Sequence, residues 1–318
     1  MRARPGNGPG TLGAMSRRGW IAFAALSVIW GVPYLFIRIA VRGGVPPLVL
    51  AWGRVTLAAV ILLVLAAQAG TLSSLRGRWR AVIGLALAEI VFPFSLIAAG
   101  EQHVSSSLTA IEIATVPLIL AVLAMRYDHS ERPTVSRAVG LAVGFAGVVA
   151  LVGIDVAGRG SELVGSAAIL VAAIGYAIGP MIIKHRLARL DARATMGASL
   201  AVAAVILTPL AALTWPAHVP TGGALASIAV LGVLCTAITF LILPILIAEA
   251  GPGRATVITY INPLVAVILG VTLLGEQPGA GAVAGLLLIL AGSWLSTGGR
   301  LPPRVGPLRE AKPRASLS

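Results

Sequence analysis

Ten apolar stretches follow one another along this chain, and each is close to the roughly 20 residues that a helix needs to cross a bilayer. They cover residues 19–41, 47–67, 81–99, 105–125, 136–152, 163–183, 195–213, 224–247, 254–274 and 279–297. Only 11% of the 318 residues are charged, whereas soluble domains carry about 25%. We therefore predict an all-α membrane protein with ten transmembrane helices, and the short connections leave no room for a soluble domain.

The basic residues indicate how these helices are oriented. Of the 24 lysines and arginines, 20 fall in the two tails, in alternate connections, or at the span ends next to those connections, as the positive-inside rule requires of cytoplasmic segments. We predict a multi-pass protein of the inner (plasma) membrane with cytoplasmic tails at residues 1–18 and 299–318. The net charge of +13 is divided among these short clusters, so it indicates topology and not a nucleic-acid partner.

The chain also contains an internal duplication with a constant displacement. Glu-x-Pro, Gly-Leu, Ala-Gly and a final Gly occur at 131–133, 140–141, 146–147 and 153, and again 145 positions later at 276–278, 285–286, 291–292 and 298. We predict two repeats of five spans each, residues 19–153 and 163–298. Because five is odd, the second repeat must insert upside down relative to the first. Inverted repeats are typical of secondary transporters, which bind substrate near mid-membrane between the halves.

These residues resemble a known family. Trp30-Gly31 in the first span, Pro46-Pro47 leading to Arg54, and the paired Glu-x-Pro, Gly-Leu and Ala-Gly endings are similar to the drug/metabolite transporter superfamily, in particular its EamA type. The resemblance extends from about Gly19 to Gly298 and implies ten helices, both ends inside, and a central cavity between two five-helix repeats. It also implies transport of amino acids, nucleotide sugars, other metabolites or drugs, without naming the cargo.

Charged residues inside the predicted spans are candidates for function, because a charge in the hydrocarbon is costly. Arg54 and Glu112 lie at similar depth in the second and fourth spans, so they could form an ion pair, exchange partners during transport, or hold a charged group of the substrate. Glu89 lies near the middle of the third span with no basic residue at its depth. It could couple transport to protons, donate a hydrogen bond to substrate, or be satisfied by a neighbouring helix.

Aromatic and amide side chains complete the candidate substrate site. Trp30 and Tyr34 lie one turn apart in the first span, Tyr176 occupies the corresponding part of the sixth, and Tyr260 and Asn262 precede a proline in the ninth. We expect these side chains to shape a cavity and to supply hydrogen bonds. A helix kink at the proline is the alternative interpretation of Asn262.

Polar residues near span ends have simpler expected roles. Glu131 and Glu276 each stand two residues before a proline, and we expect them to cap the helix that follows. Arg38 and Lys184, which match at a displacement of 146, end their spans and are expected to reach toward the membrane surface.

The sequence therefore favours a secondary transporter that exports a small polar metabolite, such as an amino acid, by alternating access and with a proton as the candidate coupling ion. A multidrug exporter of the same superfamily is the alternative, although no acidic residue lies in the first span. An enzyme or a scaffold is not supported, since HExxH, GxSxG and Walker A motifs are absent and no cofactor or metal site is indicated. The expected partners are the lipid bilayer and a small-molecule substrate; the oligomeric state, a homodimer included, is left open.

Overall fold

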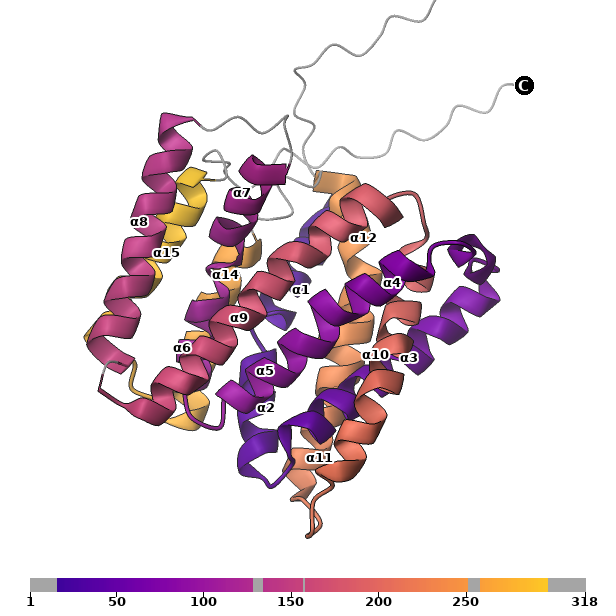
Figure 1. Cartoon of the computed structure of the whole chain (residues 1–318), viewed down its shortest axis with the longest axis horizontal. Coiled ribbons are helices and arrows are strands. Elements are labelled where there is room, and N and C mark those ends of the chain that lie inside the picture. The colour runs from indigo at the N-terminus through magenta and orange to yellow at the C-terminus, as the bar shows by residue number, and fades with distance from the viewer. Residues whose placement is uncertain (1–15, 128–133, 157, 251–257, 297–318) are drawn as a thin grey trace, which may run out of the picture.

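The computed structural model describes residues 16–127, 134–156, 158–250 and 258–296, and every regular element in these ranges is helical (Figure 1). Residues 1–15 of the first predicted tail, the whole second tail, and the residues Glu131 and Gly298 lie outside the described residues. Eight helices are long and apolar enough to cross a membrane, and two shorter apolar helices, Ile258–Leu274 and Ala280–Ser296, follow them. The predicted all-α architecture of ten spans is confirmed.

The first five spans are built from eleven helical segments, several of which join end to end. They are α1 (Arg17–Ile29), α2 (Pro33–Arg42), α3 (Pro47–Gln68), η1 (Leu72–Leu75), α4 (Trp79–Leu85), η2 (Ala86–Val91), α5 (Phe92–Gly100), α6 (Ser106–Ile113), α7 (Val116–Tyr127), α8 (Val135–Leu151) and η3 (Val152–Val156). Of these, α1 and α2 form the first span, α4, η2 and α5 the third, and α6 and α7 the fourth.

The second half repeats this order. Its segments are α9 (Gly160–Ile182), η4 (Ile183–Leu187), α10 (Ala192–Leu213), α11 (Gly222–Ala229), η5 (Val230–Ile238), α12 (Thr239–Ala250), α14 (Ile258–Leu274) and α15 (Ala280–Ser296). The third and eighth spans each contain a π-helical segment, η2 and η5, at corresponding positions. The irregularity is therefore a property of both repeats.

The two repeats are joined by α8 and α15, the last helix of each, which lie side by side and antiparallel (Figure 1). Gly140 of α8 lies against Gly292 of α15, and Gly285 of α15 lies against Gly147 of α8. The displacement of 145 residues relates 140 to 285 and 147 to 292, so the two contacts are copies of one another. Equivalent helices that pack antiparallel are what an axis in the membrane plane produces, and the missing side chains let the backbones approach closely.

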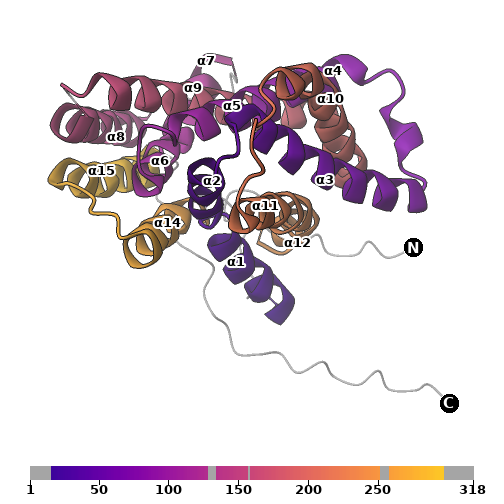
Figure 2. The same cartoon turned by 90° about the horizontal axis from the view of Figure 1, so that it is seen from below.

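The first helix of each half packs against the third and fourth spans of the other half. The first span contacts α11, α12 and α14, whereas α9 contacts α5, α6 and α7. Viewed from the end, α2 lies near the middle of the bundle (Figure 2). Because the first helix of each half packs into the other half, side chains of both repeats lie around the centre of the protein.

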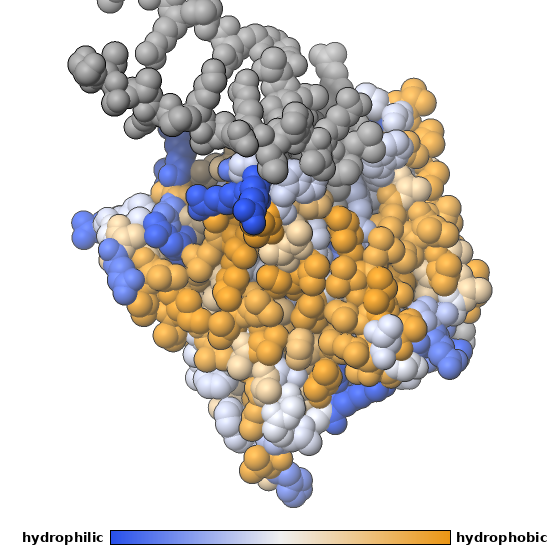
Figure 3. Space-filling model, turned by 180° about the vertical axis from the view of Figure 1, so that it is seen from behind, coloured by the Kyte–Doolittle hydropathy of each residue, from blue (hydrophilic) through white to orange (hydrophobic). Residues whose placement is uncertain are grey.

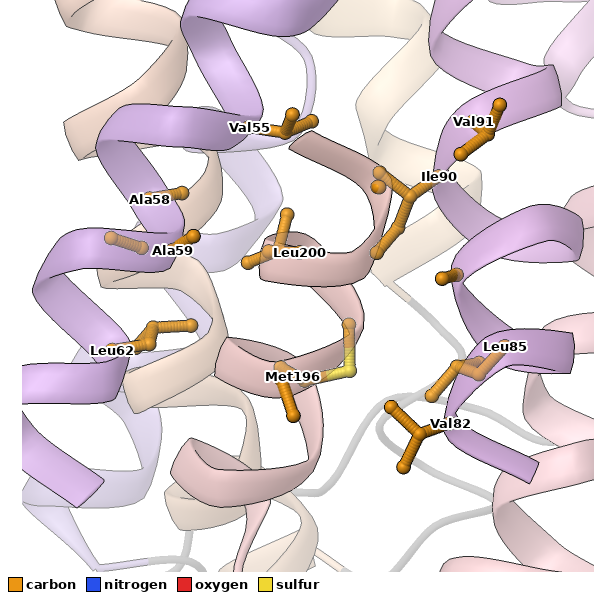
Figure 4. Packing of buried hydrophobic residues seen from close by; sticks show 14 of the residues in the cluster. Val55, Ala58, Ala59, Leu62, Val82, Leu85, Ile90, Val91, Met196 and Leu200 are labelled. Carbon is orange, nitrogen blue, oxygen red and sulfur yellow. The ribbon is translucent and has the colours of Figure 1, made fainter. Parts of the chain in front are cut away.

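Apolar packing fills the remaining space between the helices. Figure 4 shows Met196 and Leu200 of α10 between Leu62 of α3 on one side and Leu85 and Ile90 of the third span on the other. The face of the molecule seen in Figure 3 is also largely apolar across its middle, with hydrophilic residues toward its edges. A surface of this kind is suited to a lipid environment.

The first span is interrupted between α1 and α2, and other side chains satisfy the backbone there. Gly31 lies against the backbone oxygen of Asn262 and the side chain of Val265. With its amide nitrogen oriented toward the neighbouring carbonyls, Asn262 donates to Ser27 O at 3.0 Å and to Ile258 O at 2.8 Å. The carbonyl groups beside the break in the helix therefore have a hydrogen-bond partner that is not water, as a membrane interior requires.

Candidate functional site

Arg54 of α3 is the buried cation at the contact between the two repeats. Only 8% of its surface is exposed, its Nε donates to Thr236 Oγ1 of η5 at 2.8 Å, and its guanidinium carbon lies 3.9 Å from the centroid of the Phe94 ring in α5. Neither terminal nitrogen makes a hydrogen bond with any described residue. The cation is therefore held by a hydroxyl and an aromatic face, and its fork of donors remains available.

Arg54 and Glu112 do not pair in this conformation, so similar depth in the membrane did not bring them together. Glu112 lies in α6 with 1% of its surface exposed. Ser166 of α9 lies beside it, yet neither carboxylate oxygen makes a hydrogen bond of normal geometry to a described residue. The permanent ion pair, one of the alternatives raised by the sequence, is excluded for this state.

Two of the predicted tyrosines lie with Arg54. The Tyr176 ring of α9 meets Phe94 edge-on, with centroids 6.4 Å apart. Tyr34 of α2 lies within electrostatic reach of both Tyr176 and Arg54. Both tyrosines are half-buried, although helices from both repeats surround them. Arg54, Tyr34, Phe94 and Tyr176 therefore form one polar and aromatic group, which we name the central cluster.

The other predicted aromatic and amide residues lie away from the central cluster. Trp30 and Tyr260 border a separate apolar group around α1 and α12, and the Tyr260 hydroxyl donates to Ser293 O at 3.3 Å. Asn262 bonds the carbonyls beside the interrupted first span, and α14 continues through Pro263. In this conformation these side chains support the helices around the site.

Glu89 lies in the π-helical segment η2 and faces α9. Its carboxylate packs against Gly179, where any side chain would collide with it, and Gly175 lies against the backbone oxygen of Ala88. The buried Oε2 has no hydrogen-bond partner among the described residues. Tyr176 is its titratable neighbour toward the central cluster. Glu89 thus presents an unpaired carboxyl group in the middle of the third span, and π-helical turns of this kind are frequent at functional sites.

The structure also contains a buried acid that the sequence analysis did not select. Glu101 directly follows α5, is fully buried, and has no hydrogen bond to either carboxylate oxygen within the described chain. Nη1 of Arg38 donates to the backbone oxygen of Glu101, so this partly exposed arginine is bonded to the end of the third span. Glu101 lies just after the predicted third span, 81–99, where a charged residue is expected of a connection, and nothing in the sequence places it beside Arg38.

Glu276 caps a helix of the opposite repeat, which corrects the expectation that it caps its own. Its carboxylate accepts from the backbone nitrogens of Ser106 and Ser107 at 2.8 and 2.9 Å, and from their hydroxyls at 2.9 and 2.5 Å. The helix after Glu276 is capped by Asp155, which accepts from Gly281 N and Ala282 N. The corresponding expectation for Glu131 lies outside the described residues.

An apolar groove of about 480 Å³ lies elsewhere, beside α3 and α11. Trp52 and Trp215 contribute to its wall and meet edge-on with ring centroids 6.0 Å apart. None of the predicted site residues lines this groove. Its apolar character does not match a polar substrate, so the central cluster remains the candidate site.

The duplicated helical architecture and the buried polar residues between its halves define a membrane transporter of the inverted-repeat class. The EamA-like transporter family matches residues 17–153 and 163–298 of this chain, and the chain belongs to that family.

Individual relatives agree with this assignment. The chain is 31% identical to the uncharacterized inner membrane transporter YedA of Escherichia coli, over 80% of this chain and 82% of YedA. It is 30% identical to a probable terminal-alkyne amino-acid exporter of Streptantibioticus cattleyicolor, over 86% of this chain and 94% of that protein. A solved structure titled only "Crystal structure of protein" shares the fold with a TM-score of 0.64 at 20% identity, covering 89% of this chain and 98% of its own.

The contact between Glu276 and α6 leads to a prediction about stability and pH. Burial opposes the charge on Glu276, but the hydrogen bonds from Ser107 and Ser106 outweigh it and lower the pKa of this carboxyl group. Stabilisation by a carboxylate whose pKa is depressed on folding is complete above its unfolded pKa of about 4.3 and is lost as the pH falls through the folded value. We expect Glu276→Gln to destabilise the purified protein at pH 7 by about 1 kcal/mol, the usual size of a lost cap.

The measurement is thermal unfolding in detergent at a series of pH values. The difference between wild type and Glu276→Gln should shrink below about pH 4.3, whereas Glu162→Gln, at an exposed surface pair with Arg159, should match wild type throughout. A difference that stays constant down to acid pH would contradict the role of the ionised carboxylate.

Proposed function

We propose that this EamA-family protein exports a small polar metabolite, such as an amino acid, by alternating access with a proton as the coupling ion. The observation that carries the proposal is Arg54, a buried cation in contact with both repeats that has no carboxylate partner among the described residues. An intramembrane charge without a partner is a natural site for a substrate group of opposite charge, and the planar fork of arginine matches a carboxylate.

Three further features support this assignment. The central cluster draws its residues from α2, α3, α5 and α9, so a substrate there would contact both halves and respond to their relative movement. The printed name of the Streptantibioticus cattleyicolor relative, an amino-acid exporter, is consistent with a carboxylate-bearing cargo. Glu89 offers a second unpaired group near Tyr176 for an ammonium group or a proton.

Replacement of Arg54 tests the carboxylate site. We expect Arg54→Gln to abolish transport of radiolabelled amino acids in proteoliposomes, because the neutral amide cannot compensate a buried carboxylate. Arg54→Lys should retain part of the activity, since it keeps the charge but loses the fork. Arg159→Gln, which removes an exposed charge, serves as the control. Wild-type transport by correctly folded Arg54→Gln would eliminate the proposed role.

Replacement of Glu89 tests the coupling role of that carboxyl group. Glu89→Gln preserves the shape of the side chain but cannot bind and release a proton, so we expect transport to be reduced or to lose its pH dependence while expression is unchanged. Uptake should be measured across a range of pH values, with Glu162→Gln as the control. Uptake that follows the wild-type curve at every pH would rule out coupling at this residue.

We also propose that both ends of the chain are cytoplasmic in the inner membrane, because 20 of the 24 basic residues belong to the tails and connections on that side or to the span ends next to them. Reporter fusions at each terminus measure this directly. A cytoplasmic reporter should be active at both ends, and a periplasmic reporter active at either end would reverse the assignment.

A further inference from the structure

Glu101, like Glu112, is a buried titratable group outside the central cluster. It is fully enclosed and both of its carboxylate oxygens lack a hydrogen bond within the described residues. An unsatisfied buried carboxyl group costs free energy that a glutamine or an apolar residue would avoid. A functional partner that comes and goes, such as a proton, accounts for such a group.

The charged and titratable groups around Glu101 come from several elements. Arg38 and Tyr34 face it from α2, Glu276 from the connection before α15, and Arg54 from α3. Arg38 makes its hydrogen bond to the backbone oxygen of Glu101 and not to its carboxylate, whereas Glu276 is fully occupied with Ser106 and Ser107. The carboxyl group of Glu101 is thus left without a fixed partner while its neighbours are held in place.

Burial raises the pKa of Glu101 well above its usual range, and although Arg38 lowers it, this effect is smaller. In the enclosed conformation burial therefore favours the protonated form of this carboxyl group. Opening of this end of the protein to water would remove the desolvation and favour release or exchange of that proton.

A line of titratable groups leads from Glu101 to the middle of the membrane. Tyr34 is a neighbour of both Glu101 and Tyr176, and Tyr176 is in turn a neighbour of Glu89. The sequence of groups is thus Glu101, Tyr34, Tyr176 and Glu89, and Arg54 lies beside the two tyrosines. Glu101, directly after the third span, is twelve residues from Glu89, which is about 18 Å along a helix and too far for a direct transfer.

We propose that Glu101 is the outer proton-binding site of this transporter and that the hydroxyl groups of Tyr34 and Tyr176 relay the proton to Glu89. Each tyrosine accepts a proton on its oxygen while its own proton passes to the next group, so no charge remains on either ring. No direct hydrogen bond joins neighbouring members in this conformation, and each step therefore uses side-chain rotation or a bridging water. Partial exposure of both tyrosines is consistent with access for water.

This inference rests on the export function proposed above. Two transport assays distinguish a failure of the proton relay from a failure of the export function. Proteoliposomes that contain wild type, Glu101→Gln or Tyr34→Phe are assayed with a mixture of radiolabelled L-amino acids. One assay applies a pH gradient, and the other measures exchange of internal for external amino acid at equal pH. Exchange needs substrate binding and movement but no net proton transfer.

The expected result is that Glu101→Gln loses gradient-driven transport to the level of empty liposomes but retains exchange. Tyr34→Phe, which removes a hydroxyl group of the central cluster, should also lose gradient-driven transport. Glu162→Gln and Tyr127→Phe, at exposed positions, should retain both modes, whereas Arg54→Gln should lose both. Gradient-driven transport that persists in Glu101→Gln would overturn the relay, as would equal loss of both modes, which indicates a structural role. Absence of amino-acid movement by wild type would overturn the export function itself, and the relay with it.

Infrared spectroscopy of the purified, substrate-free protein gives an independent readout. The carbonyl stretch of protonated carboxyl groups should lose intensity in Glu101→Gln and remain unchanged in Glu162→Gln. An unchanged band in Glu101→Gln would show that the residue carries no proton and would overturn the proposal even if transport were impaired.

Discussion

The contact between the backbones of α8 and α15 determines how the two halves of this protein are related. Glycines at equivalent positions meet across it, and the helices run in opposite directions. A parallel contact would have placed the symmetry axis along the membrane normal, with two halves facing the same way. The antiparallel contact instead gives two similar halves of opposite orientation, from which inward-open and outward-open states of similar energy can arise.

Against this symmetric framework the polar interior is asymmetric. Glu89 has Cys235 at its counterpart position, 146 residues later, although both lie in π-helical segments. Several charges outside this interior have fixed partners, as Asp191 has in Arg193 at the start of α10. Arg54, Glu89 and Glu101 lack such partners in the described chain. Charges that stabilise the fold therefore have fixed partners, whereas these three side chains remain available to bind a substrate group or a proton.

Much of this architecture was predictable from hydropathy, because lipid demands long apolar helices and tolerates little variation in their length. The second span was expected at 47–67 and is observed at Pro47–Gln68. The contacts between spans were harder to predict from the sequence. Depth along a helix suggested a pair between Arg54 and Glu112, but depth does not specify which way a side chain points around the helix axis. Glu101 was missed and Glu276 was assigned to the wrong helix because their environments depend on α2 and α6, which are distant in sequence.

The first helix of each half packs against the other half, and this arrangement has a consequence for biogenesis. A membrane protein is synthesised from its N-terminus, yet the helices against which α1 packs, α12 and α14, belong to the other end of the chain. The first span must therefore remain in the bilayer with its interior face unmatched until the eighth and ninth spans have been inserted. Neither repeat can complete its own packing, and the mature bundle forms only when nearly the whole polypeptide has left the ribosome.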